Sequence, residues 1–138
     1  MKFQPKKTKY NKFFKGTNVG NAKRGENIVF GKFALKAIEH ARLTSNQIES
    51  ARKTIVKSIR KIGKLWIRIF PDIPVSKKPV DVRMGKGKGS VSHYICKIKP
   101  GRILFEIDFV LEKHAKEAFH KANSKLGVKT IFCKNYLV

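Results

Sequence analysis

A short glycine-rich segment holds the residues of this 138-residue sequence that are best suited to phosphate chemistry. It comprises Arg83, Met84, Gly85, Lys86, Gly87, Lys88 and Gly89. Because glycine has no Cβ atom, such a backbone reaches angles closed to other residues and can approach a phosphate closely. We therefore predict that the segment contacts nucleic acid. The alternative is a flexible loop that binds nothing.

The same segment differs from the phosphate-binding loop of nucleoside triphosphatases. That loop needs a Gly-Lys-Ser or Gly-Lys-Thr sequence that opens a helix after a strand. Here Ser90 follows a glycine, and the residues after it have the pattern of a strand. The sequence therefore does not predict an ATPase.

Other residues with catalytic potential are scattered along the chain. His40, His93, His114 and His120 show no metal-ligand spacing with one another or with the two cysteines, Cys96 and Cys133. Asp72 and Asp81 have no neighbouring residues that would support acid–base chemistry, and no nucleophile motif is present. We predict no catalytic residue, metal site, cofactor or small-molecule substrate.

The net charge of the chain identifies its class of partner. The sequence carries 32 Lys and Arg against 9 Asp and Glu, a formal charge of +23. Such an excess opposes compaction unless a polyanion neutralises it. Two cysteines are too few for a disulfide framework, and no apolar run approaches a membrane span. These features argue against a secreted or membrane protein and favour a nucleic-acid-binding one.

The positive charge is concentrated in three blocks with few acids. Residues 1–25 contain no acid and no helical or strand period, so we predict a loose basic arm that orders on its partner, rather than a solvated terminus. Residues 52–68 form the second block and residues 77–102 the third. The nucleic-acid contacts predicted from the first two blocks are Lys6, Lys7, Lys9, Lys12, Lys15, Lys23, Arg24, Arg52, Lys53, Lys57, Arg60, Lys64 and Arg68.

The elements that must position these residues follow from hydrophobic periodicity and turn residues. Apolar residues at three- and four-residue steps predict helices over 45–62 and 111–126, the first opened by a Thr44–Gln47 capping box and closed by Gly63. The inner face of the second helix is predicted to begin at Leu111 and the helix to end at Gly127.

Strand patterns occur over 28–35, 64–70, 91–99, 102–110 and 128–133. Residues 99–101 form a tight turn that predicts a hairpin between two of these strands, and prolines 71, 74 and 79 predict an extended loop. Trp66 could stack on a base or pack within the protein, and packing is favoured.

Together the elements predict an α+β fold, a two-layer sandwich with two helices packed on a mostly antiparallel or mixed sheet. The basic N-terminal arm, residues 1–25, and the glycine-rich loop are predicted to extend from a single domain, residues 26–138. One domain suits a chain of this length.

Several of these motifs resemble one family over nearly the whole chain. Residues 66–74 followed by 78–79 and 82–89 closely resemble the bacterial and organellar family of large-subunit ribosomal protein L-sixteen. The resemblance extends to residues 5–9, 30–37, 43–44, 47–49, 51–52, 99–106 and 129–130.

The resemblance implies an α+β domain that is a structural constituent of the large ribosomal subunit. It implies binding to large-subunit rRNA and neighbouring ribosomal proteins, and a role in positioning tRNA near the peptidyl transferase region. By this analogy the basic blocks contact rRNA, while Arg83, Lys86 and Lys88 lie nearest to tRNA or the rRNA beneath it. The family implies no catalysis by the protein.

Composition and the start of the chain bear on the compartment. The chain begins with the family's own first residues, and it holds 25 Lys against 7 Arg with 14 Ile and 10 Phe. This balance resembles proteins from AT-rich coding sequences. We predict an organellar ribosome, with the mitochondrion favoured over the plastid and the bacterial cytoplasm as the alternative.

Two other classes of function would use the same basic surface. A free-standing DNA- or RNA-binding regulator should carry a recognition element, yet no helix-turn-helix, zinc-finger or RNP motif is present. A nucleic-acid-modifying enzyme should carry an acid, base or metal cluster. The regulator is the main alternative.

Overall fold

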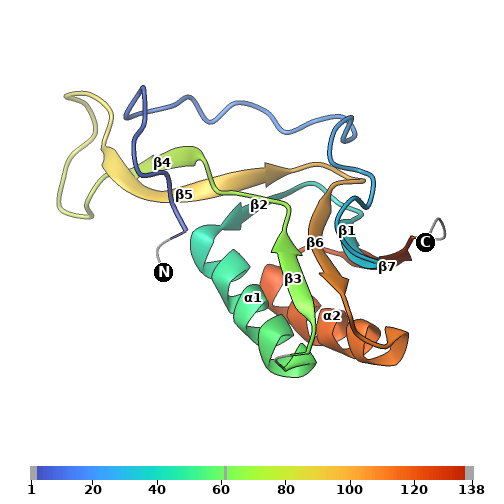
Figure 1. The fold of residues 1–138 in the computed structure, drawn as a ribbon. Coiled ribbons are helices and arrows are strands. Elements are labelled where there is room, and N and C mark those ends of the chain that lie inside the picture. The colour runs from blue at the N-terminus through green and yellow to red at the C-terminus, as the bar shows by residue number, and fades with distance from the viewer. Residues whose placement is uncertain (1–2, 61, 136–138) are drawn as a thin grey trace.

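The computed structural model describes residues 3–60 and 62–135. Within them the chain forms seven strands and two helices (Figure 1). In chain order these are β1 (Phe33–Ala37), β2 (Ala41–Thr44), α1 (Ser45–Ile59), β3 (Lys64–Ile67), β4 (Ile73–Lys77), β5 (Ser90–Ile98), β6 (Ile103–Asp108), α2 (Glu112–Leu126) and β7 (Thr130–Lys134).

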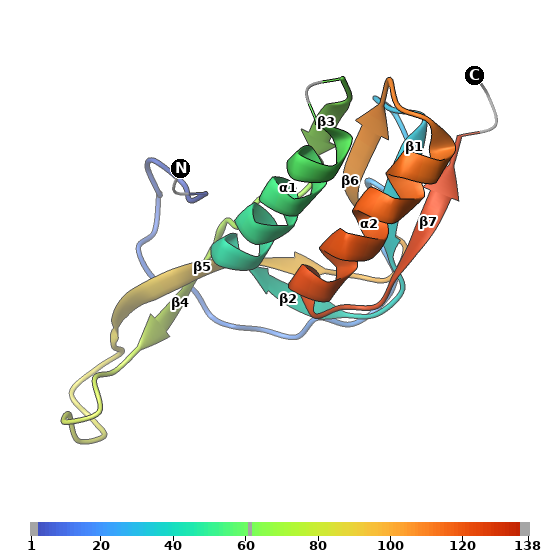
Figure 2. The same cartoon turned by 90° about the horizontal axis from the view of Figure 1, so that it is seen from below.

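The larger sheet has the order β3-β6-β1-β7, and α1 and α2 lie side by side against one of its faces (Figure 2). All its strand pairs are antiparallel. The core lies between the helices and this sheet. From α1 it takes Ile48, Ala51, Ile55 and Ile59, and from α2 it takes Ala115, Ala118, Phe119, Ala122 and Leu126. This confirms the predicted α+β sandwich and, except at Ile62 and Leu111, both apolar helix stripes.

The ends of the helices are partly as predicted. The Thr44 hydroxyl accepts a hydrogen bond from the Gln47 amide while the Gln47 side chain accepts one from the Thr44 amide, so the capping box is confirmed. Gly127 ends α2 in the left-handed region. Leu111, however, is the N-cap residue of α2 and is 71% exposed, so its predicted place on the inner face is wrong.

The predicted span 45–62 for the first helix is too long. The helix ends at Ile59, and Arg60 takes a positive φ of 52°. Ile62 is exposed, and Lys61 lies outside the described residues. Gly63 does not cap the helix. A Cβ atom there would lie 2.6 Å from a methyl carbon of Val110. This glycine instead permits the connection between α1 and β3 to approach the turn between β6 and α2 closely.

A second sheet, which was not predicted, has the order β2-β5-β4. The turn at residues 99–101 exists, since the Arg102 amide donates to the Lys99 carbonyl over 3.1 Å. The hairpin that it was predicted to close is wrong, because β5 pairs with β2 and β4 whereas β6 pairs with β1 and β3. The turn therefore passes the chain from one sheet to the other.

The proline-rich stretch is also partly a strand. Strand β4 places Pro74 opposite Tyr94 of β5, which contradicts the extended loop predicted there. Strand β4 is at the edge of its sheet, where proline is tolerated because one side of the strand needs no hydrogen-bond donors. Beyond it, β4 and β5 form a hairpin that projects away from the helices and carries the glycine-rich loop at its end (Figure 2).

The segment predicted as the first strand, residues 28–35, is strand only from Phe33 onward. The backbone amides of Val29, Phe30 and Gly31 do not enter a ladder, because all three donate to the carboxylate of Glu106 on β6. A Cβ atom on Gly31 would lie 2.6 Å from the Ile107 carbonyl oxygen, so glycine is required at this contact.

Candidate nucleic-acid interface

The structure brings part of the N-terminal arm against the glycine-rich loop. The Lys12 ammonium donates to the Lys88 carbonyl over 2.8 Å, and the Lys88 ammonium donates to the Phe13 carbonyl. The Lys88 ammonium also lies 5.5 Å from the centre of the Phe14 ring. Two basic blocks far apart in the sequence therefore meet at the end of the β4–β5 hairpin. We call this region, residues 12–14 with residues 83–89, the tip surface.

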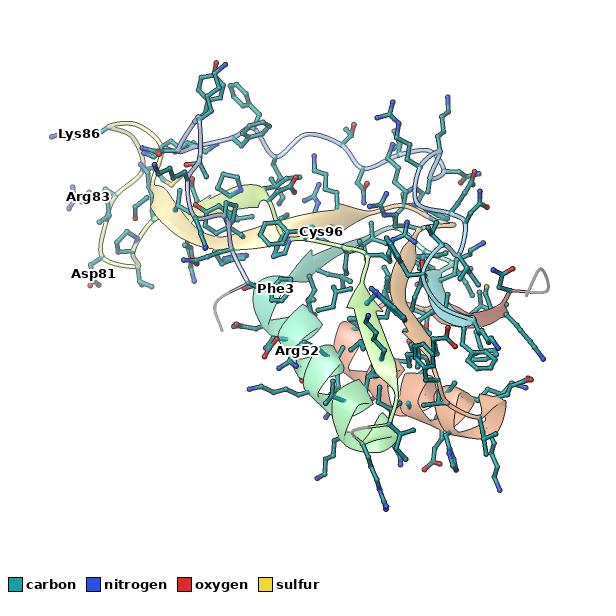
Figure 3. All side chains as sticks on the ribbon, in the orientation of Figure 1. Phe3, Arg52, Asp81, Arg83, Lys86 and Cys96 are labelled. Carbon is teal, nitrogen blue, oxygen red and sulfur yellow. The ribbon has the colours of Figure 1, made fainter. Side chains whose placement is uncertain are left out.

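Backbone geometry explains the glycines of the tip surface. Gly85 and Gly87 have φ values of 101° and 88°, and Lys86 between them has a φ of 53°. Side chains rarely adopt these angles, so the glycines hold the turn that presents Lys86. Arg83, Lys86 and Lys88 are exposed, and the first two lie at the far end of the hairpin (Figure 3).

The second basic block lies on a separate part of the molecule. Arg52, Lys53, Lys57 and Arg60 belong to α1 or its C-terminal end, and Figure 3 shows Arg52 well away from the tip surface. Lys53, Lys57 and Arg60 are exposed. Arg52 makes two hydrogen bonds to Glu49, and this pairing lowers the pKa of the Glu49 carboxyl and raises that of Arg52. The predicted contacts thus form two surfaces rather than one.

Arg68 differs from the other predicted contacts. Its guanidinium forms an ion pair with Glu106, whose side chain is fully buried, and it also lies 5.1 Å from the centre of the Phe30 ring. Phe30 in turn stacks on Trp66, with ring centres 6.2 Å apart. The structure therefore gives Arg68 and Trp66 roles in packing the segment around Phe30, which agrees with the favoured interpretation of Trp66.

The arm residues between the tip surface and β1 lie along the second sheet (Figure 1). The Asn18 amide group donates to the carbonyls of Ala41 and Ile98, over 3.2 and 2.8 Å, and bridges β2 and β5. The Ala22 amide donates to the Pro100 carbonyl over 2.9 Å. The boundary at residue 25, and the looseness of the free arm, stay predictions.

Most acids of the described residues are paired, and mainly outside the arm and the tip surface. Glu112 accepts hydrogen bonds from Lys116 and Lys134, which lower its pKa to about 2. Glu117 pairs with Lys121 on α2, and Glu39 pairs with Lys129. Among the described residues, no acid forms an ion pair with an arm lysine or with Arg83, Lys86 or Lys88. The arm and the tip surface therefore keep their positive charge for a partner.

Two further findings concern other classes of function. In the described part of the chain, no group of three or more His, Cys, Asp or Glu side chains could hold a metal ion. No helix there is long and apolar enough to cross a membrane.

Sequence reasoning missed three residues that organise these surfaces. Asn18 anchors the arm, Glu106 gathers three backbone amides and Arg68, and Arg102 donates to the carbonyls of Arg24 and Arg68. A lone acid within the apolar run of residues 103–107 was the available signal for Glu106, because a charge in a buried strand requires partners. No sequence signal marks Asn18.

The chain is similar over nearly its whole length to known bacterial proteins. A family model described as ribosomal protein L16p/L10e matches residues 5–133. The large ribosomal subunit protein uL16 of Allorhizobium ampelinum is 54% identical over 129 residues, which cover 94% of each chain. The proteins of that name from Thioalkalivibrio sulfidiphilus and Rhizobium etli are 53% and 54% identical over the same share of each chain. This confirms the family inferred from the motifs: the chain belongs to the ribosomal protein L16p/L10e family.

Proposed function

We propose that this protein is a structural constituent of the large ribosomal subunit that binds large-subunit rRNA through its basic surfaces. The observation that carries the proposal is the match, over 94% of each chain, to proteins named as large-subunit ribosomal proteins. A charge of +23 supports it, as does a basic arm whose described lysines form no ion pair with an acid, because rRNA is the polyanion that such a surface needs. The family is a structural component of the ribosome, so the prediction that the protein is not an enzyme is confirmed.

The two surfaces receive different parts of this function in our proposal. The arm lysines and the exposed cations of α1 contact rRNA phosphates. Neighbouring ribosomal proteins are further partners of the protein. The tip surface faces tRNA near the peptidyl transferase region, because its exposed charges lie at the end of a projecting hairpin (Figure 3). Arg52 and Arg68 contribute less to phosphate binding than their charge suggests, since each is paired with a carboxylate.

The ribosome is the location that the family supports. The relatives named above are bacterial, so they fit the bacterial alternative and give no support to an organellar ribosome. The Lys- and Ile-rich composition fits an AT-rich bacterial coding sequence as well. We therefore propose a ribosome of bacterial type, and the mitochondrial assignment stays a prediction without support.

Sedimentation of the native protein from its own cells tests the proposal. We expect the chain to travel with large subunits through a sucrose gradient at moderate salt and to leave them at high salt, because phosphate contacts are screened. A regulator would sediment as a free pool or with other nucleic acid. Recovery of most of the protein away from large subunits would overturn the proposal.

The loop has its own test, which separates assembly from function. Replacing Lys86 and Lys88 together by alanine removes two of 32 basic residues, and exposed charge contacts contribute about 1 kcal/mol or less each, so incorporation should be retained. We expect peptide synthesis per assembled subunit to fall several-fold, since tRNA meets few other cations at this tip. Occupancy of purified subunits and translation rate are measured together.

Three variants control this experiment. Lys113→Ala with Lys125→Ala removes the same charge from α2 and should leave translation unchanged. Lys86→Ala alone spares the contacts of Lys88 with Phe13 and Phe14, so it isolates the loop charge from arm anchoring. Gly87→Ala keeps the charge but strains a residue with a φ of 88°. If the Lys86→Ala, Lys88→Ala variant translates at the normal rate at full occupancy, the loop only helps to hold the protein on rRNA and has no role in tRNA binding.

A further inference from the structure

A groove of about 1060 Å³ lies where the arm crosses the junction of the two sheets. One wall is arm residues 20–24 with Phe3, and the other is the connection from β3 to β4. The C-terminal part of β5 and the turn between β5 and β6 complete it. Figure 3 shows Phe3 and Cys96, which both line the groove, near the middle of the molecule and apart from the glycine-rich loop.

Hydrogen bonds fix the arm wall in place. The Ala22 amide donates to the Pro100 carbonyl and the Ile103 amide donates to the Gly25 carbonyl, both over 2.9 Å. A ring nitrogen of His40 lies 2.9 Å from the Gly20 carbonyl oxygen. The Arg102 guanidinium donates to the Arg24 carbonyl over 2.7 Å. The groove is therefore formed before any ligand arrives, which lowers the entropic cost of binding.

The lining combines charges of both signs with an apolar floor. It includes six cations, Lys23, Arg24, Arg68, Lys97, Lys99 and Arg102, and among its described residues a single acid, Asp72. Ile67, Ile69, Phe70 and Ile73 supply apolar surface. A bare polyanion such as inorganic phosphate would gain nothing from this floor and would be repelled by Asp72. A nucleotide suits all three features, because it joins a phosphate to a flat base with hydrogen-bond donors.

Phe70 offers the surface on which a base can pack. Its side chain is 47% exposed, and its ring touches that of Phe3 with centres 5.7 Å apart. Lys23 and Lys99 are brought to the same end of the groove by the bond between Ala22 and Pro100, one residue from each. Both lysines are exposed, and no described acid forms an ion pair with either.

We propose that this groove binds an unpaired RNA nucleotide, with its base against Phe70 and its phosphate near Lys23 and Lys99. The inference rests on the proposed rRNA binding and specifies the form of RNA that the groove accepts. A paired base cannot reach the floor, because its faces are stacked within the helix. In this proposal the arm forms one wall of an RNA-binding site, in addition to contributing positive charge.

The two cysteines provide a direct assay in the full-length protein. Cys96 lines the groove, whereas Cys133 lies on β7 outside it, and both are half-buried. We expect a saturating single-stranded oligouridine of about ten nucleotides, a typical length for such sites, to slow alkylation of Cys96 about tenfold. Alkylation of Cys133 should stay unchanged, and an RNA duplex of equal length should protect neither thiol.

Matched variants separate the groove from general electrostatics. Phe70→Ala should weaken oligouridine binding about tenfold, because base–aromatic stacking contributes about 1–3 kcal/mol. Phe109→Ala, which removes a ring that is more exposed, at 67%, and lies outside the groove, should not. Lys23→Ala with Lys99→Ala should weaken binding more than Lys113→Ala with Lys125→Ala, although both pairs remove the same charge.

Each result bears on the proposal. Unchanged Cys96 reactivity, equal protection of both cysteines, or equal protection by duplex RNA would overturn it, as would equal losses in the groove and control variants. Phosphate alone protecting Cys96 would point to an anion site instead of a nucleotide site. If the protein still sediments with large subunits in any of these cases, rRNA binding stands and this groove takes no part in it.

Discussion

Replacing Glu106 by glutamine should lower the free energy of unfolding by about 3–5 kcal/mol, the usual range when one member of a buried ion pair is removed. The Glu106 side chain is fully buried on β6. Its Oε2 atom accepts from the amides of Phe30 and Gly31 over 2.6 and 2.9 Å, and its carboxylate is also reached by the Val29 amide at 3.3 Å. Arg68 supplies the opposite charge.

The physical reason is that glutamine cannot serve these donors. A carboxylate only accepts hydrogen bonds, whereas the glutamine side chain places an NH₂ group where one oxygen stood. That group would face either backbone amides or the Arg68 guanidinium, and the charge of Arg68 would lose its partner. Domains of this size unfold with about 5–15 kcal/mol, so the change removes a large share of the stability.

Thermal and denaturant unfolding measure this effect, and the chain offers a matched control. Glu39 forms an ion pair with Lys129 over 2.7 Å, and that hydrogen bond lowers the pKa of Glu39, yet the Glu39 side chain is 46% exposed. Glu39→Gln should therefore leave the free energy of unfolding almost unchanged. A Glu106→Gln variant as stable as Glu39→Gln would show that the buried carboxylate is not needed to hold residues 29–31.

A second comparison separates charge pairing from packing. Arg68→Met combined with Glu106→Met should be less destabilising than the sum of the two single changes, because the double variant, unlike either single one, leaves no unpaired buried charge. It would still lose the amide contacts at residues 29–31. Additive losses would mean that Arg68 and Glu106 act independently.

Both helices and most strands of this fold could be predicted from the sequence, whereas β2, β4 and the pairing of the strands could not. Both helices followed from the apolar steps and from the Thr44 and Gly127 signals, which act within one or two turns of chain. The hairpin at residues 99–101 was predicted wrongly, because strand pairing depends on competition between edges. Strand β6 pairs with β1 and β3, which lie far from it in the sequence, and not with β5.

The candidate site shows the same division between local and long-range information. Charge blocks and the glycine-rich loop were evident because residue type alone marks them. The contact of Lys12 with the Lys88 carbonyl joins residues 76 positions apart, and no periodicity predicts it. Glu106 and Asn18 are single polar residues whose partners are mostly backbone atoms, and every residue carries such atoms. Arg68 was predicted as an RNA contact because its carboxylate partner, Glu106, is 38 positions away in the sequence, where no local pattern reveals the pairing.

The affinity of the protein for an rRNA fragment should fall steeply with salt. Thirteen residues outside the loop were predicted to contact rRNA, and two of them, Arg52 and Arg68, are paired with acids. If about 8–10 of the others and the loop cations contact phosphates, log affinity against log salt should have a slope of about −6 to −9. Between roughly 50 and 200 mM salt, the affinity would fall by about 10³–10⁵.

Variants that remove charge from one surface at a time show which surface makes the phosphate contacts behind this slope. Each phosphate contact contributes about −0.7 to −0.9 to the slope, so replacing Lys6, Lys7, Lys9 and Lys12 by glutamine should make it shallower by about 3–4. The matched control replaces the lysines of α2, Lys113, Lys116, Lys121 and Lys125, of which two already pair with Glu112 and Glu117. That variant should keep the original slope.

The slope is more informative than the affinity, because it counts released ions and is insensitive to stacking or shape. Stacking of a base on Phe70 adds affinity without adding slope, whereas phosphate contacts, of Lys23 and Lys99 in the groove and of the other arm lysines, add both. A slope near −1 for the unaltered protein would contradict phosphate-dominated binding. An equal change in the arm and α2 variants would mean that the rRNA responds to net charge and that the two separate surfaces have no distinct role.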